Sequence, residues 1–185
     1  IGKKADELAV MALDAPVSGG DIGAQNATLT IMVGGNQTAF ETMKPIFDQI
    51  GHATNYFGTY GAGQNAKMAN QIMIAGTLSG LCEGLRYAQA KGLDGRKLLG
   101  ALATGAAGSK QMDALGGKIL AGDHAPGFFL KHFVKDMTLA LGESRDSGLS
   151  LEVLGQVLEN CRDLEERGLG DLGTQALMVH YRPEE

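Results

Sequence analysis

The pattern of apolar and polar positions changes character near residue 63. Before that point it predicts a helix over residues 3–13 and a helix with an apolar stripe from residue 40 to residue 50. Short apolar or β-branched runs predict strands at 13–17, 28–33 and 54–57. Alternation of helices and strands is typical of an α/β domain, and this one begins with its pattern already under way at Ile1.

From Gly63 onward the apolar spacing is helical throughout. It predicts one long helix over 64–90, then helices near 94–104, 108–121, 131–147 and 150–167, with glycines between them. We therefore predict α/β plus all-α architecture. Residues 1–62 form the remainder of a Rossmann-type domain, and residues 63–185 form a long connecting helix and an all-helical domain.

Composition narrows the classes of function. With 44% hydrophobic residues the chain is too apolar for a disordered protein, and a net charge of −5 without a basic run argues against nucleic-acid binding. The longest uncharged stretch, residues 68–82, is too short and too polar for a membrane span, so we expect no membrane partner. Two cysteines, Cys82 and Cys161, cannot make a disulfide framework, which favours reduced thiols and a cytoplasmic location.

Residues 61–66 read Gly-Ala-Gly-Gln-Asn-Ala and match the G-x-G-x-x-A pattern of dinucleotide-binding loops. A Rossmann unit needs a further parallel strand after the following helix, whereas only helices are predicted here. We therefore interpret the segment as a glycine turn at the start of a helix rather than a phosphate-binding loop.

Lys67 lies in the first turn of the predicted long helix and precedes the uncharged stretch. The helix dipole and partial burial both disfavour an ammonium there and lower the pKa of the lysine toward neutrality, which suits a general acid/base. Asn70 and Gln71 share its helix face at i+3 and i+4 and could hold a substrate oxygen. The alternative is a lysine that extends to solvent from a helix end.

Two further segments are candidates. Ser18, Gly19 and Gly20 follow a predicted strand, and their backbone N–H groups with the Ser18 hydroxyl would suit a carboxylate; the alternative is a tight turn. Lys135 and Asp136 follow an aromatic stretch and by themselves indicate a surface ion pair. The four histidines lack metal-ligand spacing and G-x-S-x-G is absent, so we expect neither a metal site nor a serine nucleophile.

Three segments together resemble the β-hydroxyacid dehydrogenase family. They are Asp14-Ala-Pro-Val-Ser-Gly-Gly20, Gly61-Ala-Gly-Gln-Asn-Ala-Lys-Met-Ala-Asn-Gln71 and Lys135-Asp136. The resemblance implies hydride transfer between NAD or NADP and a short semialdehyde or 3-hydroxy acid. It makes Ser18, Gly19 and Gly20 the loop for the substrate carboxylate, Lys67 the catalytic lysine, and Lys135 with Asp136 the contacts to the cofactor. It also implies a homodimer or homotetramer.

The resemblance carries two departures from the family pattern. The family commonly has Asn four residues after its lysine, but Gln71 stands there, with Asn70 before it. This pair is similar to the tartronate semialdehyde (2-hydroxy-3-oxopropionate) reductase branch. The family's first strand and pyrophosphate loop do not precede Ile1, so we expect a truncated chain that is inactive alone.

Three functions stay open at this point. The first is reduction of tartronate semialdehyde. The second is the 3-hydroxyisobutyrate dehydrogenase or glyoxylate/succinic semialdehyde reductase reaction, and pocket polarity would separate these from the first. The third belongs to another class, a non-catalytic dimerisation module.

Overall fold

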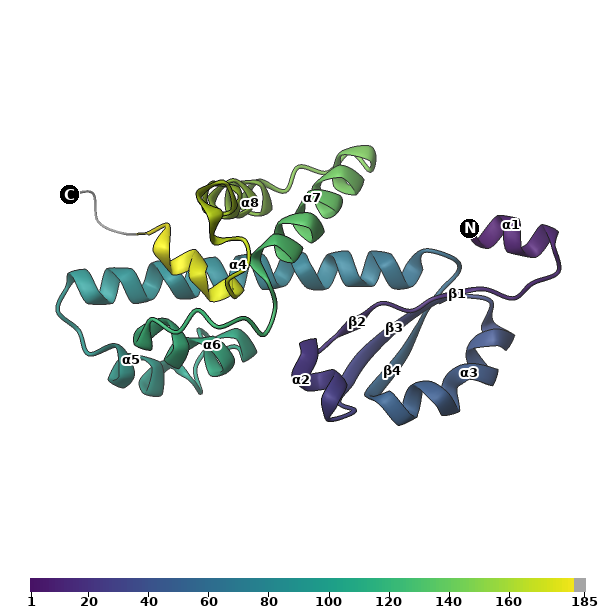
Figure 1. The fold of residues 1–185 in the computed structure, drawn as a ribbon, viewed down its shortest axis with the longest axis horizontal. Coiled ribbons are helices and arrows are strands. Elements are labelled where there is room, and N and C mark those ends of the chain that lie inside the picture. Colours follow the sequence, from purple (N-terminus) through teal and green to yellow (C-terminus); the bar gives the residue numbers. More distant parts are fainter. Residues whose placement is uncertain (182–185) are drawn as a thin grey trace. The chain divides into compact units, whose positions relative to one another are not determined.

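The computed structural model describes residues 1–181, which divide into two compact units, one over Ile1–Asn70 and one from Gln71 onward. The first unit contains three helices, four strands and the beginning of the long helix (Figure 1). These elements are α1 (Gly2–Glu7), β1 (Leu13–Asp14), β2 (Val17–Ser18), α2 (Gly20–Gln25), β3 (Leu29–Gly35), α3 (Gln37–Ile50), β4 (Gly51–Gly58) and α4 (Ala62–Ala90).

Strand β3 is the centre of the sheet. β4 pairs parallel to it after the crossover helix α3, as a β-α-β unit requires. β1 and β2 pair antiparallel to β3 in succession, Asp14 opposite Gly34 and Ser18 opposite Thr30. The core of the unit consists of the buried side chains of β3, with partly buried apolar residues packed on them: Leu29, Ile31 and Val33, against Leu13, Ala15, Phe40 and Phe47.

Three predictions for this unit need correction in their bounds. The predicted helix over 3–13 is only α1, because the chain turns at Ala9, whose φ of +53° closes the helix with a bond from the Val10 N–H to Ala5 O. Every residue of α1 is at least partly exposed, so little packing supports a longer helix. The predicted strand 13–17 is two short strands interrupted at Pro16, and the predicted strand 54–57 extends over all of β4.

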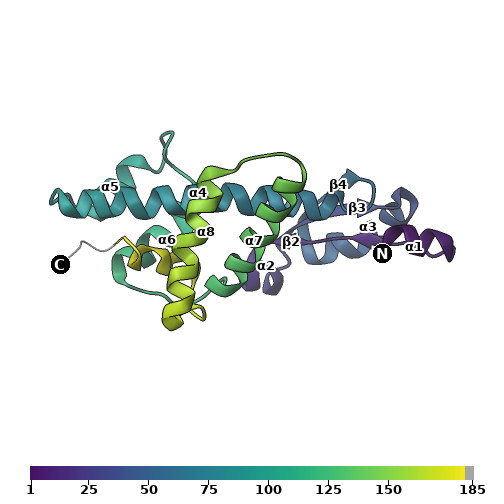
Figure 2. The same cartoon turned by 90° about the horizontal axis from the view of Figure 1, so that it is seen from above.

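The helical order predicted for the second unit is confirmed. α4 is followed by α5 (Gly95–Leu102), α6 (Lys110–Ala121), α7 (Leu130–Asp146) and α8 (Glu152–Leu164), then by the short turns η1 (Glu165–Leu169) and η2 (Thr174–Val179). α7 packs against α8, and both contact η2 (Figure 2). The core of the unit combines buried residues of α4, α7, α8 and η2, which include Leu78, Leu85, Leu130, Phe133, Met137, Leu154, Leu164 and Leu177.

The predicted domain boundary at residue 62 coincides with the start of α4, whereas the compact units divide within that helix, after Asn70. The boundary therefore stays a prediction. Among the described helices, none combines the length and the apolar character needed to cross a membrane. Cys82 and Cys161 are both buried and free.

Candidate active site

The start of α4 is held by a carboxylate from the sheet. The Gly61 N–H donates to Asp14 Oδ1 at 2.8 Å, and the Gln64 N–H donates to Asp14 Oδ2 at 2.9 Å. Backbone N–H groups in the first turn of a helix have no partner within the helix, and the helix dipole favours negative charge there. Asp14 therefore caps α4 from a strand that lies 47 residues earlier in the sequence.

Two glycines allow this close approach. A Cβ on Gly63 would press on the Met32 carbonyl oxygen and lie 2.8 Å from both the backbone and a carboxylate oxygen of Asp14. A Cβ on Gly34 would lie 2.7 Å from the Gly63 nitrogen and 2.8 Å from Asp14 Oδ1. Neither position has room for a side chain, so the first turn of α4 and the end of β3 are in direct backbone contact.

This contact explains the G-x-G-x-x-A pattern at residues 61–66. The N–H groups that would meet a phosphate in a dinucleotide-binding loop instead receive the carboxylate of Asp14. The structure thus supports the interpretation of a glycine turn at a helix start.

Lys67 follows one helical turn after the end that Asp14 caps. Its side chain is half-buried, as is that of Asn70, while Gln71 is 1% exposed. All three take part in interactions within the structure. Their spacing in the continuous helix α4 puts them on one face, as predicted, so an amine and two amides lie in succession along it.

Gln71 bonds to Asp136 on α7, within the second unit. The Gln71 Nε2 donates to Asp136 Oδ2 at 2.8 Å, and the Lys135 ammonium lies 3.0 Å from Asp136 Oδ1. The Asp136 side chain is only 9% exposed, whereas that of Lys135 is 66% exposed. The structure therefore brings together three of the residues named from the sequence, with a buried carboxylate between an amide and a surface ammonium.

Ser18, Gly19 and Gly20 lie where β2 passes into α2. Gly19 has a φ of +135° and Gly20 a φ of +61°, conformations that a residue with a side chain adopts only under strain. Ser18 is half-buried and both glycines are exposed. Exposed backbone N–H groups beside a hydroxyl can receive a carboxylate, and this loop belongs to the same compact unit as Lys67 and Asn70.

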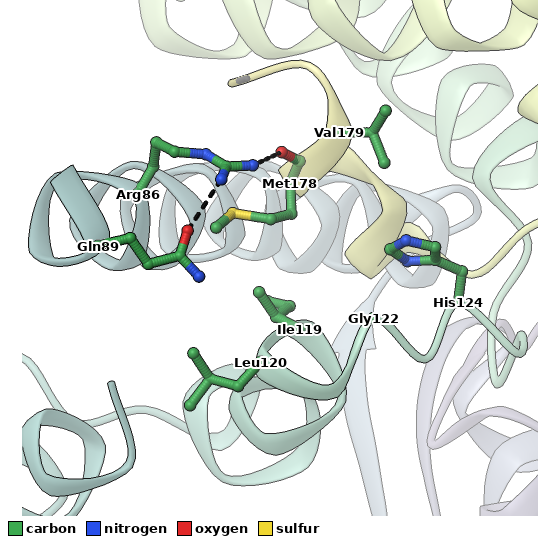
Figure 3. Close-up of a pocket in the computed structure, with 8 residues that line it drawn as sticks. All are labelled: Arg86, Gln89, Ile119, Leu120, Gly122, His124, Met178 and Val179. Carbon is green, nitrogen blue, oxygen red and sulfur yellow. Dashed lines mark hydrogen bonds between the residues drawn. The ribbon is translucent and has the colours of Figure 1, made fainter. Parts of the chain in front are cut away.

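A separate pocket of about 220 Å³ lies in the second unit (Figure 3) and contains none of the residues named above. Arg86 donates to Gln89 Oε1 at 2.8 Å and to the Met178 carbonyl oxygen at 3.1 Å, whereas its Nε and the His124 Nδ1 are buried without a hydrogen-bond partner in the described part of the chain. Within residues 1–181 no cluster of three or more His, Cys, Asp or Glu side chains could hold a metal ion.

Sequence reasoning gave Asp14 no role of its own. The available signal was an acidic residue within the predicted strand 13–17, together with the absence of a Ser, Thr, Asp or Asn at residues 60–62, where the structure begins the helix. Such a helix needs an acceptor from elsewhere in the chain. The sequence does not show which of the acidic residues supplies it.

Comparisons with known proteins extend over the whole site. Residues 1–61 match the family model described as the NAD binding domain of 6-phosphogluconate dehydrogenase. Residues 61–181 match the model described as NAD-binding of NADP-dependent 3-hydroxyisobutyrate dehydrogenase. The second match begins at Gly61 and includes Lys67, Asn70, Gln71, Lys135 and Asp136.

Individual relatives agree with these matches. The chain is 48% identical, over 97% of its length, to a probable 3-hydroxyisobutyrate dehydrogenase-like 1 protein, mitochondrial, from Arabidopsis thaliana, and covers 53% of that protein. It is 38% identical, over 80% of its length, to 2-hydroxy-3-oxopropionate reductase from Escherichia coli, covering 51% of it. The chain thus spans about half the length of these two curated relatives.

A solved structure supports the fold. The crystal structure of a 3-hydroxyisobutyrate dehydrogenase from Salmonella typhimurium superimposes with a TM-score of 0.88 at 23% identity. The superposition covers 97% of this chain and 64% of that one.

Proposed function

Because the chain belongs to the 3-hydroxyisobutyrate dehydrogenase family of NAD(P)-dependent β-hydroxyacid dehydrogenases, we propose that the protein it forms part of is an oxidoreductase. It transfers hydride between NAD(P)H and a short semialdehyde or 3-hydroxy acid. The observation that carries this proposal is the position of Lys67, one turn into a helix whose start is tied to the strand that leads to the Ser18–Gly20 loop.

Lys67 is the general acid in the direction of reduction. When hydride adds to the carbonyl carbon, the carbonyl oxygen becomes an alkoxide, and the Lys67 ammonium gives it a proton and becomes a neutral amine. In oxidation the amine takes the hydroxyl proton instead. A positively charged group beside the developing oxyanion also stabilises the transition state more than the ground state.

The substrate carboxylate binds at Ser18, Gly19 and Gly20. The positive φ angles of the two glycines support this assignment, because such turns orient backbone N–H groups toward an anion. Binding the carboxylate at one fixed place orients the carbonyl with respect to the lysine, and orientation is a large part of what a protein contributes to this reaction.

The nicotinamide cofactor supplies the hydride when bound. Among the residues present, Lys135 fits a contact to it, since its exposed ammonium would attract a phosphate or ribose oxygen while the buried Asp136 holds the side chain in place. The start of α4 does not fit the pyrophosphate, because the Asp14 carboxylate already accepts its N–H groups.

For the substrate we propose tartronate semialdehyde. This compound carries a hydroxyl beside its carboxylate, and a polar substituent needs polar partners. The half-buried Asn70 amide is the better placed partner next to Lys67, because Gln71 is 1% exposed and its amide already donates to Asp136. The relative named 2-hydroxy-3-oxopropionate reductase supports this choice, whereas the higher identity to a 3-hydroxyisobutyrate dehydrogenase-like protein favours the methyl-substituted substrate as the second candidate.

Assembly and location belong to the same proposal. We expect a homodimer or homotetramer, as the family resemblance implies. Reduced cysteines favour the cytoplasm, while the Arabidopsis relative is described as mitochondrial.

The test is NAD(P)H consumption by the natural gene product that contains these 185 residues. The substrates are tartronate semialdehyde, methylmalonate semialdehyde, succinic semialdehyde and glyoxylate, with Lys67→Ala as the key variant. Lys110→Ala is the matched control, because the Lys110 side chain is fully exposed. We expect Lys67→Ala to lose at least about 100-fold in kcat, within the range for a general acid, while Lys110→Ala retains wild-type rates.

Two results would contradict the proposed function or the proposed role of Lys67. If the folded wild-type protein turns over none of these substrates with NADH or NADPH, the proposal of a semialdehyde reductase is wrong, and the non-catalytic dimerisation module becomes the better description. Turnover that survives in Lys67→Ala would retain the activity but remove the role of the lysine.

A further inference from the structure

We propose that Asp14 is a positioning residue for the acid/base lysine, because its carboxylate fixes the start of α4 with respect to the Ser18–Gly20 loop. This inference rests on the proposed function of Lys67 and of that loop. It concerns a residue that touches neither substrate nor cofactor in the mechanism above, and that acts through the helix.

The first argument is the geometry of the carboxylate. Each oxygen accepts a different N–H group, Oδ1 from Gly61 at 2.8 Å and Oδ2 from Gln64 at 2.9 Å. Two bonds from one planar group fix the helix end in direction as well as in place. Lys67 comes one turn after Gln64 in the same helix, so a displacement of the first turn displaces the amine with it.

The second argument is the route from Asp14 to the loop. Asp14 pairs with Gly34, and Ser18 pairs with Thr30, so the short segment between them is fastened at both ends to the same strand, β3. Pro16 restricts the backbone within that segment, and its carbonyl accepts the Met32 N–H at 3.0 Å. The loop and the start of α4 are therefore both held against β3, and the Asp14 side chain connects them.

The third argument is the tight packing around the bond. Gly34 and Gly63 leave no space for a Cβ beside the Asp14 carboxylate. A longer side chain at residue 14 cannot be accommodated by moving it aside, and it would push the first turn of α4 outward. Asp14→Glu keeps the charge and adds one methylene, so it tests the position of the carboxylate separately from its charge.

Asp94 offers a control for helix capping as such. It caps α5, where its Oδ1 accepts from the N–H groups of Arg96 and Lys97 at 2.9 and 3.1 Å. α5 carries none of the candidate site residues. Asp94→Ala removes a cap of the same chemical kind from a helix that the proposed mechanism does not use.

The experiment compares Asp14→Asn, Asp14→Glu and Asp94→Ala in the natural gene product, with kcat and KM for semialdehyde and cofactor and a urea unfolding curve for each. Asparagine has one acceptor oxygen where Asp14 needs two. We expect both Asp14 variants to lose about 10- to 100-fold in kcat, the scale of a misplacement of about 1 Å, with little change in either KM. Asp94→Ala should lower the unfolding midpoint and leave kcat within about twofold of wild type, since surface caps affect stability alone.

The results distinguish a failure of the proposed function from a failure of the role of Asp14. A wild-type protein without turnover on any semialdehyde overturns the proposed function and this inference together. An active wild type whose Asp14→Asn and Asp14→Glu variants match Asp94→Ala in kcat overturns the role of Asp14 and leaves the function intact. If Asp14→Asn does not fold, Asp14→Ser, which retains one short acceptor, is measured in its place, and the same loss in kcat is expected.

Discussion

Gly63→Ala is the most direct test of the contact between β3 and α4. The new methyl group would press on the Met32 carbonyl oxygen and lie 2.8 Å from two oxygens of Asp14, well inside ordinary carbon–oxygen contact. These are backbone atoms and a bonded carboxylate, so they cannot rotate away. The helix start has to move outward, and the bonds from Gly61 and Gln64 to Asp14 then lengthen or break.

The magnitude follows from two costs. Inserting a methyl group into a packed contact costs about 1–3 kcal/mol in the free energy of unfolding. Weakening a helix cap adds about 1 kcal/mol. We therefore expect Gly63→Ala to lower the free energy of unfolding of the first unit by about 2–4 kcal/mol, even though alanine is the better helix former.

The same helix supplies the control. Gly80 is exposed in the middle of α4, and a Cβ there would meet nothing within 4 Å. Gly80→Ala should raise the free energy of unfolding by up to about 1 kcal/mol, because an exposed glycine in a helix interior is that much less favourable than alanine. The same substitution at two positions of one helix is thus expected to change the free energy of unfolding in opposite directions.

Urea unfolding followed by far-ultraviolet circular dichroism measures both effects, since the chain has no tryptophan for fluorescence. Hydrogen exchange of residues 61–70 locates the loss at the start of α4. If Gly63→Ala raised stability as much as Gly80→Ala, the close contact of β3 with α4 would be wrong, and the role of Asp14 would lose its structural basis.

Two further predictions concern the second unit. Gln71→Leu leaves the buried Asp136 Oδ2 without the donor it has at 2.8 Å, so the free energy of unfolding should fall by about 1–3 kcal/mol. A double variant that also carries Asp136→Leu should recover most of this loss. Equal stabilities of the wild type and Gln71→Leu in urea would contradict the prediction. Burial raises the pKa of the Cys82 and Cys161 thiols to about 12. Neither thiol should react with a disulfide reagent at pH 8 until the protein unfolds, and stability should fall above about pH 9, where thiols ionise in the unfolded chain but not in the folded one.

The sequence predicted best where local signals carry the structure. The helices of the second unit follow from their apolar spacing, and the caps at Asp94 and Ser109 are visible as residue types before the helices they begin. Spacing and strand position made Lys67 and Ser18 to Gly20 candidates, and the family resemblance assigned roles to them and to Lys135 and Asp136. Their contacts with substrate and cofactor stay predictions.

The parts that could not be predicted depend on contacts between distant residues. Gln71 and Asp136 are 65 positions apart, and the apolar periodicity of their helices does not predict the hydrogen bond between them. The helix predicted over 3–13 ends early because its first residues are poorly buried, a property of its surroundings rather than of its alanines and leucines. Asp14 belongs to the same class, since a cap supplied from 47 positions away has no local signature at the helix it serves.

The glycines at 61 and 63 show what such a motif does report. In a dinucleotide-binding loop they allow a pyrophosphate to approach the first turn of a helix. In this chain the same first turn is approached by a strand and its aspartate, whose carboxylate provides the negative charge that the helix N-terminus favours. The pattern thus predicts a close approach of an anion to a helix start, but it does not identify the anion. Here the anion belongs to the chain itself, because β1 ends at Asp14 and the Asp14 carboxylate accepts the N–H groups of Gly61 and Gln64.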